Sequence, residues 1–182
     1  MKKKMFSAIM VLFLLAMHGC SLIEENITGA SVHNEFQELE PSAWVEYTPL
    51  VQEYFYYRTQ AVLHNDIDVL WNRYPHLSTG SSVETGVNSE SYEVTSLIDV
   101  FELIDANVAM EGFGRLRANQ VSEQELILLA NSGIEYVTHD FDVTGGEILI
   151  ELHFRYEDNE WVLIKTDEYT LPEYKEFIKN NK

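Results

Sequence analysis

The chain has 182 residues, of which 30 are acidic and 12 are lysine or arginine, so its formal net charge is −18. A chain of this charge is repelled by nucleic-acid phosphates and by anionic lipid headgroups, and we expect no nucleic-acid partner. The single cysteine excludes an intramolecular disulfide.

The first 19 residues have the pattern of an export signal. Lys2, Lys3 and Lys4 are followed by an uncharged apolar run over 5–17. This run is too short for a membrane-spanning helix, which needs roughly 20 apolar residues. It has the length and the flanks of a signal peptide, so we expect the protein to be exported.

The segment 17–20 (MHGC) resembles the lipobox of bacterial lipoproteins, in which cleavage precedes the cysteine and its sulfur carries lipid. The resemblance implies acyl chains such as palmitate on Cys20 and an anchor on the outer side of the bacterial cell membrane. Buried lipid contributes about 0.8 kcal/mol per CH₂, so two or more chains hold firmly. An ordinary secretory signal with an incidental cysteine is the alternative. Cleavage would leave 163 residues (182 minus 19) with a net charge of −21 (9 minus 30).

Residues 20–43 are interpreted as the lipidated cysteine and a flexible tether, because the stretch is polar and weakly periodic. A coil of about 20 residues spans roughly 25 Å, which would hold a domain clear of the headgroups. Alternatively, 32–39 form a short helix on the domain. One domain is expected over 44–182, a length that supports a hydrophobic core.

Three helices are predicted in the first part of this domain. The first begins at Thr48-Pro49, with Thr48 as N-cap, and breaks near 64–66. The second ends at Pro75, and the third begins at 88–89 after a loop. Apolar residues at helical spacing define the inner faces: Leu50, Tyr54, Tyr57 and Ala61; Ile67, Leu70, Trp71 and Tyr74; Val94, Leu97, Ile98, Phe101 and Ile104.

Alternation with a period of two begins near Asn107 and predicts antiparallel strands. The first is expected over 107–116, bent at its glycines, and is followed by a turn at 119–123. The next is expected over 125–138 with a bulge at 132–133.

The clearest strand pattern follows a turn predicted at Gly145-Gly146. From 148 to 157 apolar and polar residues alternate, which predicts one buried face and one face in water. Asp158-Asn159 predicts a turn into a strand at 161–166. A capping box over 170–173 starts a C-terminal helix whose apolar residues are Tyr174, Phe177 and Ile178.

Helices followed by an antiparallel meander predict an α+β fold. Residues 47–170 resemble the NTF2-like (SnoaL-like, cystatin-like α+β) superfamily in the opening helix and its break (YYRTQAVLHNDIDVLW), the long late hairpin and the phrase NEWVLIKTDEYT. The resemblance implies N-terminal helices packed on a curved antiparallel sheet, a short C-terminal helix and a cone-shaped pocket lined by helices and sheet. The superfamily includes enzymes, ligand carriers and partner-binding modules, so the fold does not define an activity.

An acidic segment gives the sharpest local match to a metal site. Asp140, Asp142, Thr144 and Glu151 have the oxygen-ligand spacing of an EF-hand calcium loop. However, Glu147 stands where an apolar residue is usual, and a strand pattern replaces the required exit helix. The alternative interpretation, an acidic β-turn without metal, is preferred.

Asp99, Asp105 and Tyr92 are candidate catalytic residues on or near the third helix. In NTF2-like enzymes a pocket Asp or His often acts as acid or base, and burial beside aromatic rings raises a carboxyl pKa. None of the three matches a family motif residue by residue, and exposed helix acids are the alternative. The histidines lack metal-binding spacing, and no cofactor is predicted.

Tyr54, Trp71, Phe101 and Phe113 are candidates to line a ligand pocket, with core filling as the alternative for each. The leading hypothesis is a membrane-anchored, extracytoplasmic lipoprotein whose one domain binds a ligand or a protein without catalysis. A small-molecule lyase, isomerase or hydrolase that uses a pocket carboxylate is the first alternative. A structural role through dimerisation is the second, and the polar outer side of 148–157 weakens it.

Overall fold

The computed structural model describes residues 36–80, 88–98, 100–110 and 112–180. The elements in chain order are β1 (Gln37–Glu38), α2 (Pro41–His64), α3 (Asp68–Arg73), the 3-10 helix η2 (Pro75–Thr79), α4 (Ser89–Ile98), β2 (Leu103–Ala109), the 3-10 turn η3 (Phe113–Arg115), β3 (Leu116–Ser122), β4 (Glu125–Thr138), β5 (Val143–Glu157), β6 (Glu160–Glu168) and α5 (Leu171–Asn180). None of the described helices is both long enough and apolar enough to cross a membrane.

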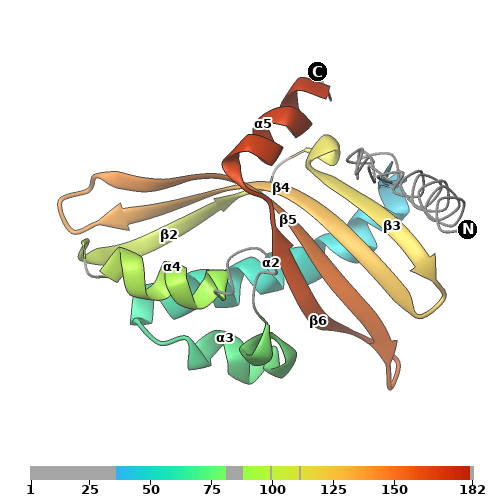
Figure 1. The fold of residues 1–182 in the computed structure, drawn as a ribbon, viewed down its shortest axis with the longest axis horizontal. Coiled ribbons are helices and arrows are strands. Elements are labelled where there is room, and N and C mark those ends of the chain that lie inside the picture. The colour runs from blue at the N-terminus through green and yellow to red at the C-terminus, as the bar shows by residue number, and fades with distance from the viewer. Residues whose placement is uncertain (1–35, 81–87, 99, 111, 181–182) are drawn as a thin grey trace, which may run out of the picture. The chain divides into compact units, whose positions relative to one another are not determined.

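The six strands form one antiparallel sheet built on the long β4–β5 hairpin. On the outer edge of β4, β3 pairs with its first half and β2 with its second half. On the opposite side of the hairpin, β6 pairs with β5 only from Ile150 onward. Among the described residues, the edge of 143–149 that faces away from β4 therefore has no strand beside it. Figure 1 shows the resulting curved sheet, with β2, β4 and β5 at one end and β3 to β6 at the other.

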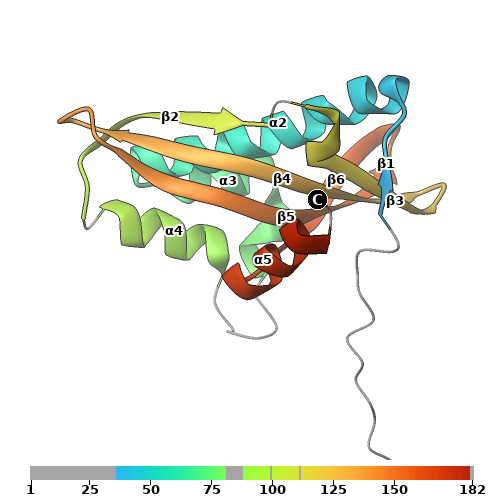
Figure 2. The same ribbon diagram turned by 90° about the horizontal axis from the view of Figure 1, so that it is seen from above.

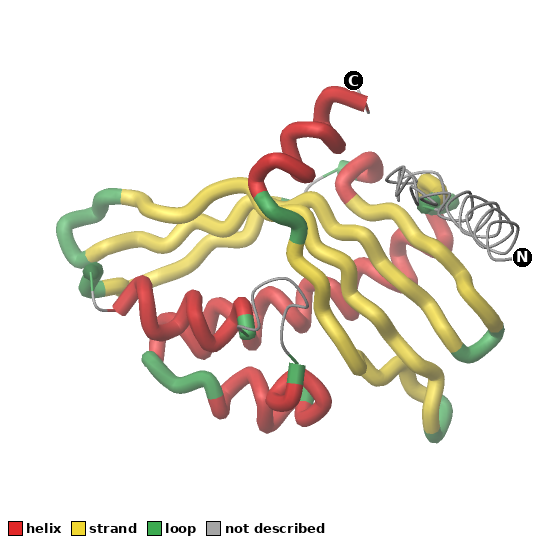
Figure 3. Tube along the Cα trace, viewed as in Figure 1, coloured by secondary structure: helices red, strands yellow, loops and turns green. Residues whose placement is uncertain are grey.

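Helices cover both faces of this sheet (Figure 3, helices in red and strands in yellow). The helices α2, α3 and α4 lie on one side and α5 lies on the other (Figures 1 and 2). The main core lies between the first three helices and the sheet, where Tyr54 and Leu128 are fully buried. A smaller cluster under α5 joins Phe36, Leu129 and Phe177. The predicted α+β class, with helices on a curved antiparallel sheet and a short C-terminal helix, is therefore confirmed.

The second face of β5 is less exposed than the alternation of residues predicts. The side chains of Glu151 and His153 are only 13 % and 22 % exposed. The Tyr169 hydroxyl donates a hydrogen bond of 2.5 Å to Glu151, and Leu149 packs with Phe177 of α5. The C-terminal segment thus covers a face that the strand pattern alone assigns to water.

The first helix starts earlier than predicted. It begins at Pro41, at a position where the missing N–H of proline leaves no hydrogen bond unmade. Pro49 therefore lies inside the helix, and Thr48 donates a hydrogen bond to the Trp44 carbonyl (2.6 Å) instead of capping the N-terminus. Upstream of Trp44, Phe36 is buried and β1 pairs with β3, so part of the segment interpreted as tether is folded.

The strand predicted over 107–116 is in fact two strands separated by a turn. The strand β2 ends at Ala109, and the backbone bends at Gly112, whose φ is +106°, before η3 and β3. Ile104, predicted on the inner face of the third helix, lies on β2 and is 47 % exposed. The turn after β3 is also shorter than predicted, because β3 continues to Ser122.

The bulge predicted at 132–133 is absent, because β4 and β5 pair without a register shift from end to end. These residues instead mark the place where the neighbour of β4 changes from β3 to β2. The Ser132 hydroxyl donates a hydrogen bond of 3.1 Å to the carbonyl of Ala109, at the end of β2.

The turn of the long hairpin lies at 139–142, not at Gly145-Gly146. Phe141, with a φ of +63°, donates its N–H to the Thr138 carbonyl (2.9 Å) and closes the turn. Both glycines belong to β5, and Gly145 has a φ of +132°. A side chain there would overlap the backbone oxygen of Ile134, so close strand contact requires the glycine.

Local signals at other boundaries are confirmed. Asn88 accepts a hydrogen bond from the Ser91 N–H (2.8 Å) at the start of α4. Glu173 accepts one from the Thr170 N–H (2.7 Å) at the start of α5. Asp158 and Asn159 both have positive φ, as the tight turn between β5 and β6 requires.

Candidate functional site

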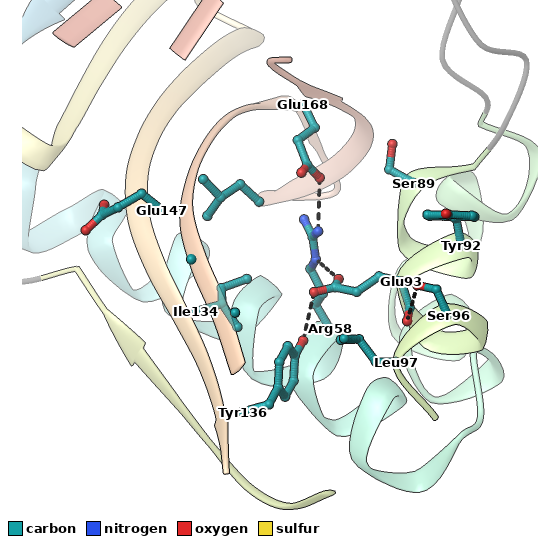
Figure 4. Close-up of a pocket in the computed structure, with 13 residues that line it drawn as sticks. Arg58, Ser89, Tyr92, Glu93, Ser96, Leu97, Ile134, Tyr136, Glu147 and Glu168 are labelled. Atoms are coloured by element: carbon teal, nitrogen blue, oxygen red, sulfur yellow. Dashed lines mark hydrogen bonds and ion pairs between the residues drawn. The ribbon is translucent and has the colours of Figure 1, made fainter. Parts of the chain in front are cut away.

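A buried arginine joins α2 to α4 and β6. The side chain of Arg58 is 4 % exposed, and its Nε lies 2.6 Å from a carboxylate oxygen of Glu93 on α4. Its Nη2 lies 2.9 Å from Glu168 at the end of β6. Figure 4 shows the guanidinium between the two carboxylates, with Glu168 on one side and Glu93 on the other.

Hydroxyl groups extend this network around the arginine. Arg58 donates from Nη1 to the Tyr54 hydroxyl (3.3 Å), which donates to Glu90 (3.0 Å). Thr166 donates to the same Glu90 oxygen (2.6 Å), and Tyr136 donates to Glu93 (3.0 Å). The Arg58 cluster consists of Tyr54, Arg58, Glu90, Glu93, Tyr136, Thr166 and Glu168.

Helical spacing places the members of this cluster on inward faces. Tyr54 and Arg58 are four residues apart on α2, and Glu90 and Glu93 are three apart on α4, so each pair shares a face. Sequence reasoning missed all of these residues except Tyr54. One signal could have identified Arg58. It is a charged residue at a position of α2 where the helical spacing predicts burial, between the buried residues Phe55 and Val62.

Burial controls the protonation of the cluster. Burial lowers the pKa of Arg58, but the nearby Glu93 and the other acidic groups outweigh it and hold that pKa well above its usual range. Burial, followed by the charge of Glu90, raises the pKa of Tyr54 well above its ordinary value. Burial and Glu93 do the same for Tyr136. At neutral pH the arginine is therefore a cation and both tyrosines are neutral hydrogen-bond donors.

A cavity of about 560 Å³ opens beside this cluster, between α4 and the hairpin β4–β5. Its wall is mostly apolar and includes the bare edge of β5 at 145–148. Four of its polar residues, Arg58, Glu93, Tyr136 and Glu168, belong to the Arg58 cluster, whereas Glu147 lies apart from them (Figure 4). The other lining residues are Ser89, Tyr92, Ser96, Leu97 and Ile134. A volume of this size is typical of small-molecule sites.

Two further cavities flank the helices. A second, of about 280 Å³, is lined by η2, the start of α4 and the end of β6, and it shares Ser89 and Glu168 with the first. Glu90 lines it as well. A third, of about 560 Å³, lies between α2 and β2 and is lined by Trp44, Gln52 and Asp105 among others.

Of the four predicted pocket aromatics, the three whose side chains are described do not line the main cavity. Tyr54 is fully buried within the Arg58 cluster. Trp71 packs against the main core, and Phe101 is half-buried just after α4. Phe113 lies in η3, and its side chain is outside the described residues. Core filling thus accounts for Trp71, while Tyr54 contributes a hydroxyl to the network.

Two of the predicted catalytic residues, Tyr92 and Asp105, line different cavities. Tyr92 lines the main cavity and is 64 % exposed. Asp105 lies on β2, lines the third cavity and accepts a hydrogen bond from the Ala106 N–H (2.8 Å). Asp99 and the predicted lipidation site Cys20 fall outside the described residues.

The residues of the predicted calcium loop are also separated. Asp140 and Asp142 lie in the hairpin turn, while Thr144 and Glu151 lie seven residues apart on the extended strand β5. Seven residues of strand span about 23 Å, so Glu151 cannot complete a loop site. Over the described ranges, no three or more His, Cys, Asp or Glu residues are grouped to hold a metal ion.

Neither known protein families nor curated proteins match this sequence. Solved structures do match. They include a calcium/calmodulin-dependent protein kinase II association domain from Xanthomonas campestris, at 8 % identity and a TM-score of 0.41, covering 70 % of this chain and 86 % of that one. They also include the association domain of C. elegans CaMKII, at 10 % identity and a TM-score of 0.39, covering 72 % and 100 %.

Proposed function

We propose that this chain is an exported lipoprotein, anchored at Cys20, that presents an extracytoplasmic domain for binding a small ligand. The observation that carries the binding role is the cavity of about 560 Å³ between α4 and the β4–β5 hairpin. An apolar wall that ends in a few fixed polar groups is the usual composition of a ligand site. The apolar run over 5–17 and the lipobox-like MHGC support export and anchoring.

The binding role is tested with Nile red, a neutral apolar dye whose fluorescence rises on leaving water. We expect saturable binding at one site. Ser96→Phe places a ring in the main cavity and should weaken binding about tenfold or more. Gln52→Phe makes the matched change in the third cavity and should leave the affinity unchanged. Loss of binding in Gln52→Phe alone, or absence of saturable binding, would contradict the proposal.

Anchoring is tested by replacing the lipidation site. Cys20→Ser should abolish incorporation of a labelled fatty acid and move the protein from the membrane fraction to the soluble fraction, because no acyl chain remains to bind the bilayer. Ser21→Ala, one residue further, should remain labelled and membrane-bound. A Cys20→Ser protein that stays in the membrane with its label intact would show that lipid is not attached there.

Catalysis is a second candidate, favoured by one observation. Arg58, Glu93, Tyr136 and Glu168 all line the main cavity, where Arg58 bonds both carboxylates and Tyr136 donates to Glu93. Both oxygens of Glu93 accept hydrogen bonds, whereas Glu168 accepts one only on Oε2 from the residues that the structure describes, and it is 31 % exposed. Glu168 is thus the carboxylate that an enzyme would use as a base. Chemical conversion of a bound ligand by the unmodified protein, lost in Glu168→Gln, would establish this role over simple binding.

A further inference from the structure

The charge balance at the polar end of the main cavity indicates the chemical class of its ligand, on the premise that this cavity is the binding site proposed above. The Arg58 cluster contains one positive group and three carboxylates, those of Glu90, Glu93 and Glu168. Within the described part of the chain, no lysine or other arginine forms an ion pair with these carboxylates. The cluster therefore has two more negative than positive charges.

The hydrogen bonds show which oxygens remain available. Glu93 uses one oxygen with Arg58 and the other with Tyr136. Glu168 uses only Oε2, and Glu90 receives both of its hydrogen bonds on Oε1. Each thus keeps an oxygen with no donor among the described residues, although Glu90 is only 4 % exposed. A buried carboxylate without a counterion is unfavourable, and a bound cation would offset this cost.

An anionic ligand does not fit the same position. Arg58 is the only cation in the cluster, and its Nε, Nη1 and Nη2 already donate to Glu93, Tyr54 and Glu168. An anion would have to displace a carboxylate from a guanidinium that is only 4 % exposed. It would also be repelled by the carboxylates left behind.

We propose that the cavity binds an amine with an apolar body. The body contacts the apolar wall at Leu97, Ile134 and Ile148, and the ammonium group donates to the free oxygen of Glu168. Glu168 and Ser89 line both the main and the second cavity, and Glu90 lines the second, so an ammonium group at Glu168 lies at the side of the main cavity that adjoins the second. A charge-assisted hydrogen bond of this kind is stronger than a neutral one.

The experiment compares octylamine, octanol and octanoate by calorimetric titration of the purified protein at neutral pH. The three share one chain and differ in the charge of the head. We expect octylamine to bind about tenfold or more tightly than octanol, and octanoate to bind most weakly. Glu168→Gln should lower the affinity for octylamine about tenfold and leave that for octanol unchanged. Glu160→Gln removes the same charge from the exposed start of the same strand and should change neither.

The outcomes separate the ligand class from the binding site. Equal affinities for octylamine and octanol, or a preference for octanoate, would overturn the amine and leave the cavity as a binding site. Binding of none of the three would overturn the binding role itself. The comparison among ligands uses the unmodified protein, so it decides the question even if Glu168→Gln does not fold.

Discussion

Arg58 is a buried residue that also lines the main cavity. Its guanidinium is buried and connects one helix to a second helix and to the last strand. Removing a charge from water is unfavourable unless partners replace the water, and here Glu93 and Glu168 do so. The same contacts leave an excess of carboxylate oxygens next to the cavity, which is the basis of the ligand class proposed above.

Replacing this arginine should be far more damaging than replacing an exposed one. Arg58→Met leaves Glu90, Glu93 and Glu168 without a counterion, and we expect the free energy of unfolding to fall by about 3–5 kcal/mol. Arg73→Met is the matched control, because Arg73 pairs with Glu53 at 43 % and 38 % exposure. That change should cost about 1 kcal/mol or less. Urea denaturation measures both, and similar losses in the two variants would contradict the role assigned to burial.

Glu151, on the face of β5 that the C-terminal segment covers, should make the stability of the fold depend on pH. Burial raises the pKa of Glu151, but hydrogen bonds from His153 and Tyr169 outweigh it, so the pKa of Glu151 lies below its usual range. A carboxylate with a lowered pKa stabilises the fold fully above its unfolded pKa of about 4.3. This contribution is lost as the pH falls through the lower folded pKa.

Glu151→Gln should therefore lower the free energy of unfolding by about 1–3 kcal/mol at neutral pH. The difference from the unmodified protein should shrink as the pH falls below about 4, because Glu151 becomes protonated first in the unfolded state and then, below its lowered folded pKa, in both states. Urea denaturation across this range measures the effect. Glu157→Gln, on the same strand with a side chain 44 % exposed, should change stability by less than about 0.5 kcal/mol at every pH. A difference independent of pH would argue against the lowered pKa.

At the scale of elements, the close approach of β4 and β5 depends on a glycine within the strand. The pair Gly145-Gly146 was expected to form a turn, yet it lies within β5 and lines the main cavity. Only Gly145 combines a positive φ with close contact to the backbone of Ile134. The hairpin thus uses glycine for close approach of two strands, and the chain reverses on residues 139–142.

Substitutions at the two glycines should separate these roles. Gly145→Ala must either strain its backbone or push the strands apart, and we expect it to cost about 1–3 kcal/mol or more. Gly146→Ala meets nothing within 4 Å and should stay within about 1 kcal/mol of the unmodified protein. Thermal unfolding of both variants provides the measurement. Equal stability of the two would mean that the strands separate without cost.

At the scale of the whole molecule, the dominant feature is negative charge. The chain carries a formal net charge of −18, and the folded domain brings three of its carboxylates together around one arginine. Self-repulsion of this size destabilises a compact state, and salt screens it. The exposed ion pairs, such as Arg155–Glu157 at 46 % and 44 % exposure, contribute little that salt could remove.

Salt should consequently stabilise this protein. Raising sodium chloride from about 0.01 M to about 0.3 M shortens the Debye length from about 30 Å to well under 10 Å and should raise Tm at neutral pH. Each kcal/mol gained corresponds to about 2–4 °C for a protein of this size. Near pH 4.5, where the net charge approaches zero, the same salt series should have little effect. A fall in Tm with salt at neutral pH would show that ion pairs outweigh the repulsion.

The amino-acid sequence by itself determined the fold class and most element boundaries that depend on neighbouring residues. The caps at Asn88 and Thr170 and the turn at Asp158-Asn159 are local, because the groups that bond lie within a few residues of each other. Local signals failed where alternatives competed, as at Pro41 and Pro49, either of which can begin a helix. Tyr54 and Trp71, predicted to line a pocket, pack in the core or against it, and helical spacing could not tell these roles apart because it reveals an inner face but not what fills it.

Only the tertiary structure decided the candidate site. Arg58 meets Glu93 across 35 residues and Glu168 across 110, and no local pattern specifies such partners. The pairing follows from the packing of α2 and α4 against the curved sheet, which also leaves the edge of β5 open beside α4. Packing is a property of the whole chain, because each burial depends on all the others, so the cavity and its excess of carboxylates appear only when the chain is folded.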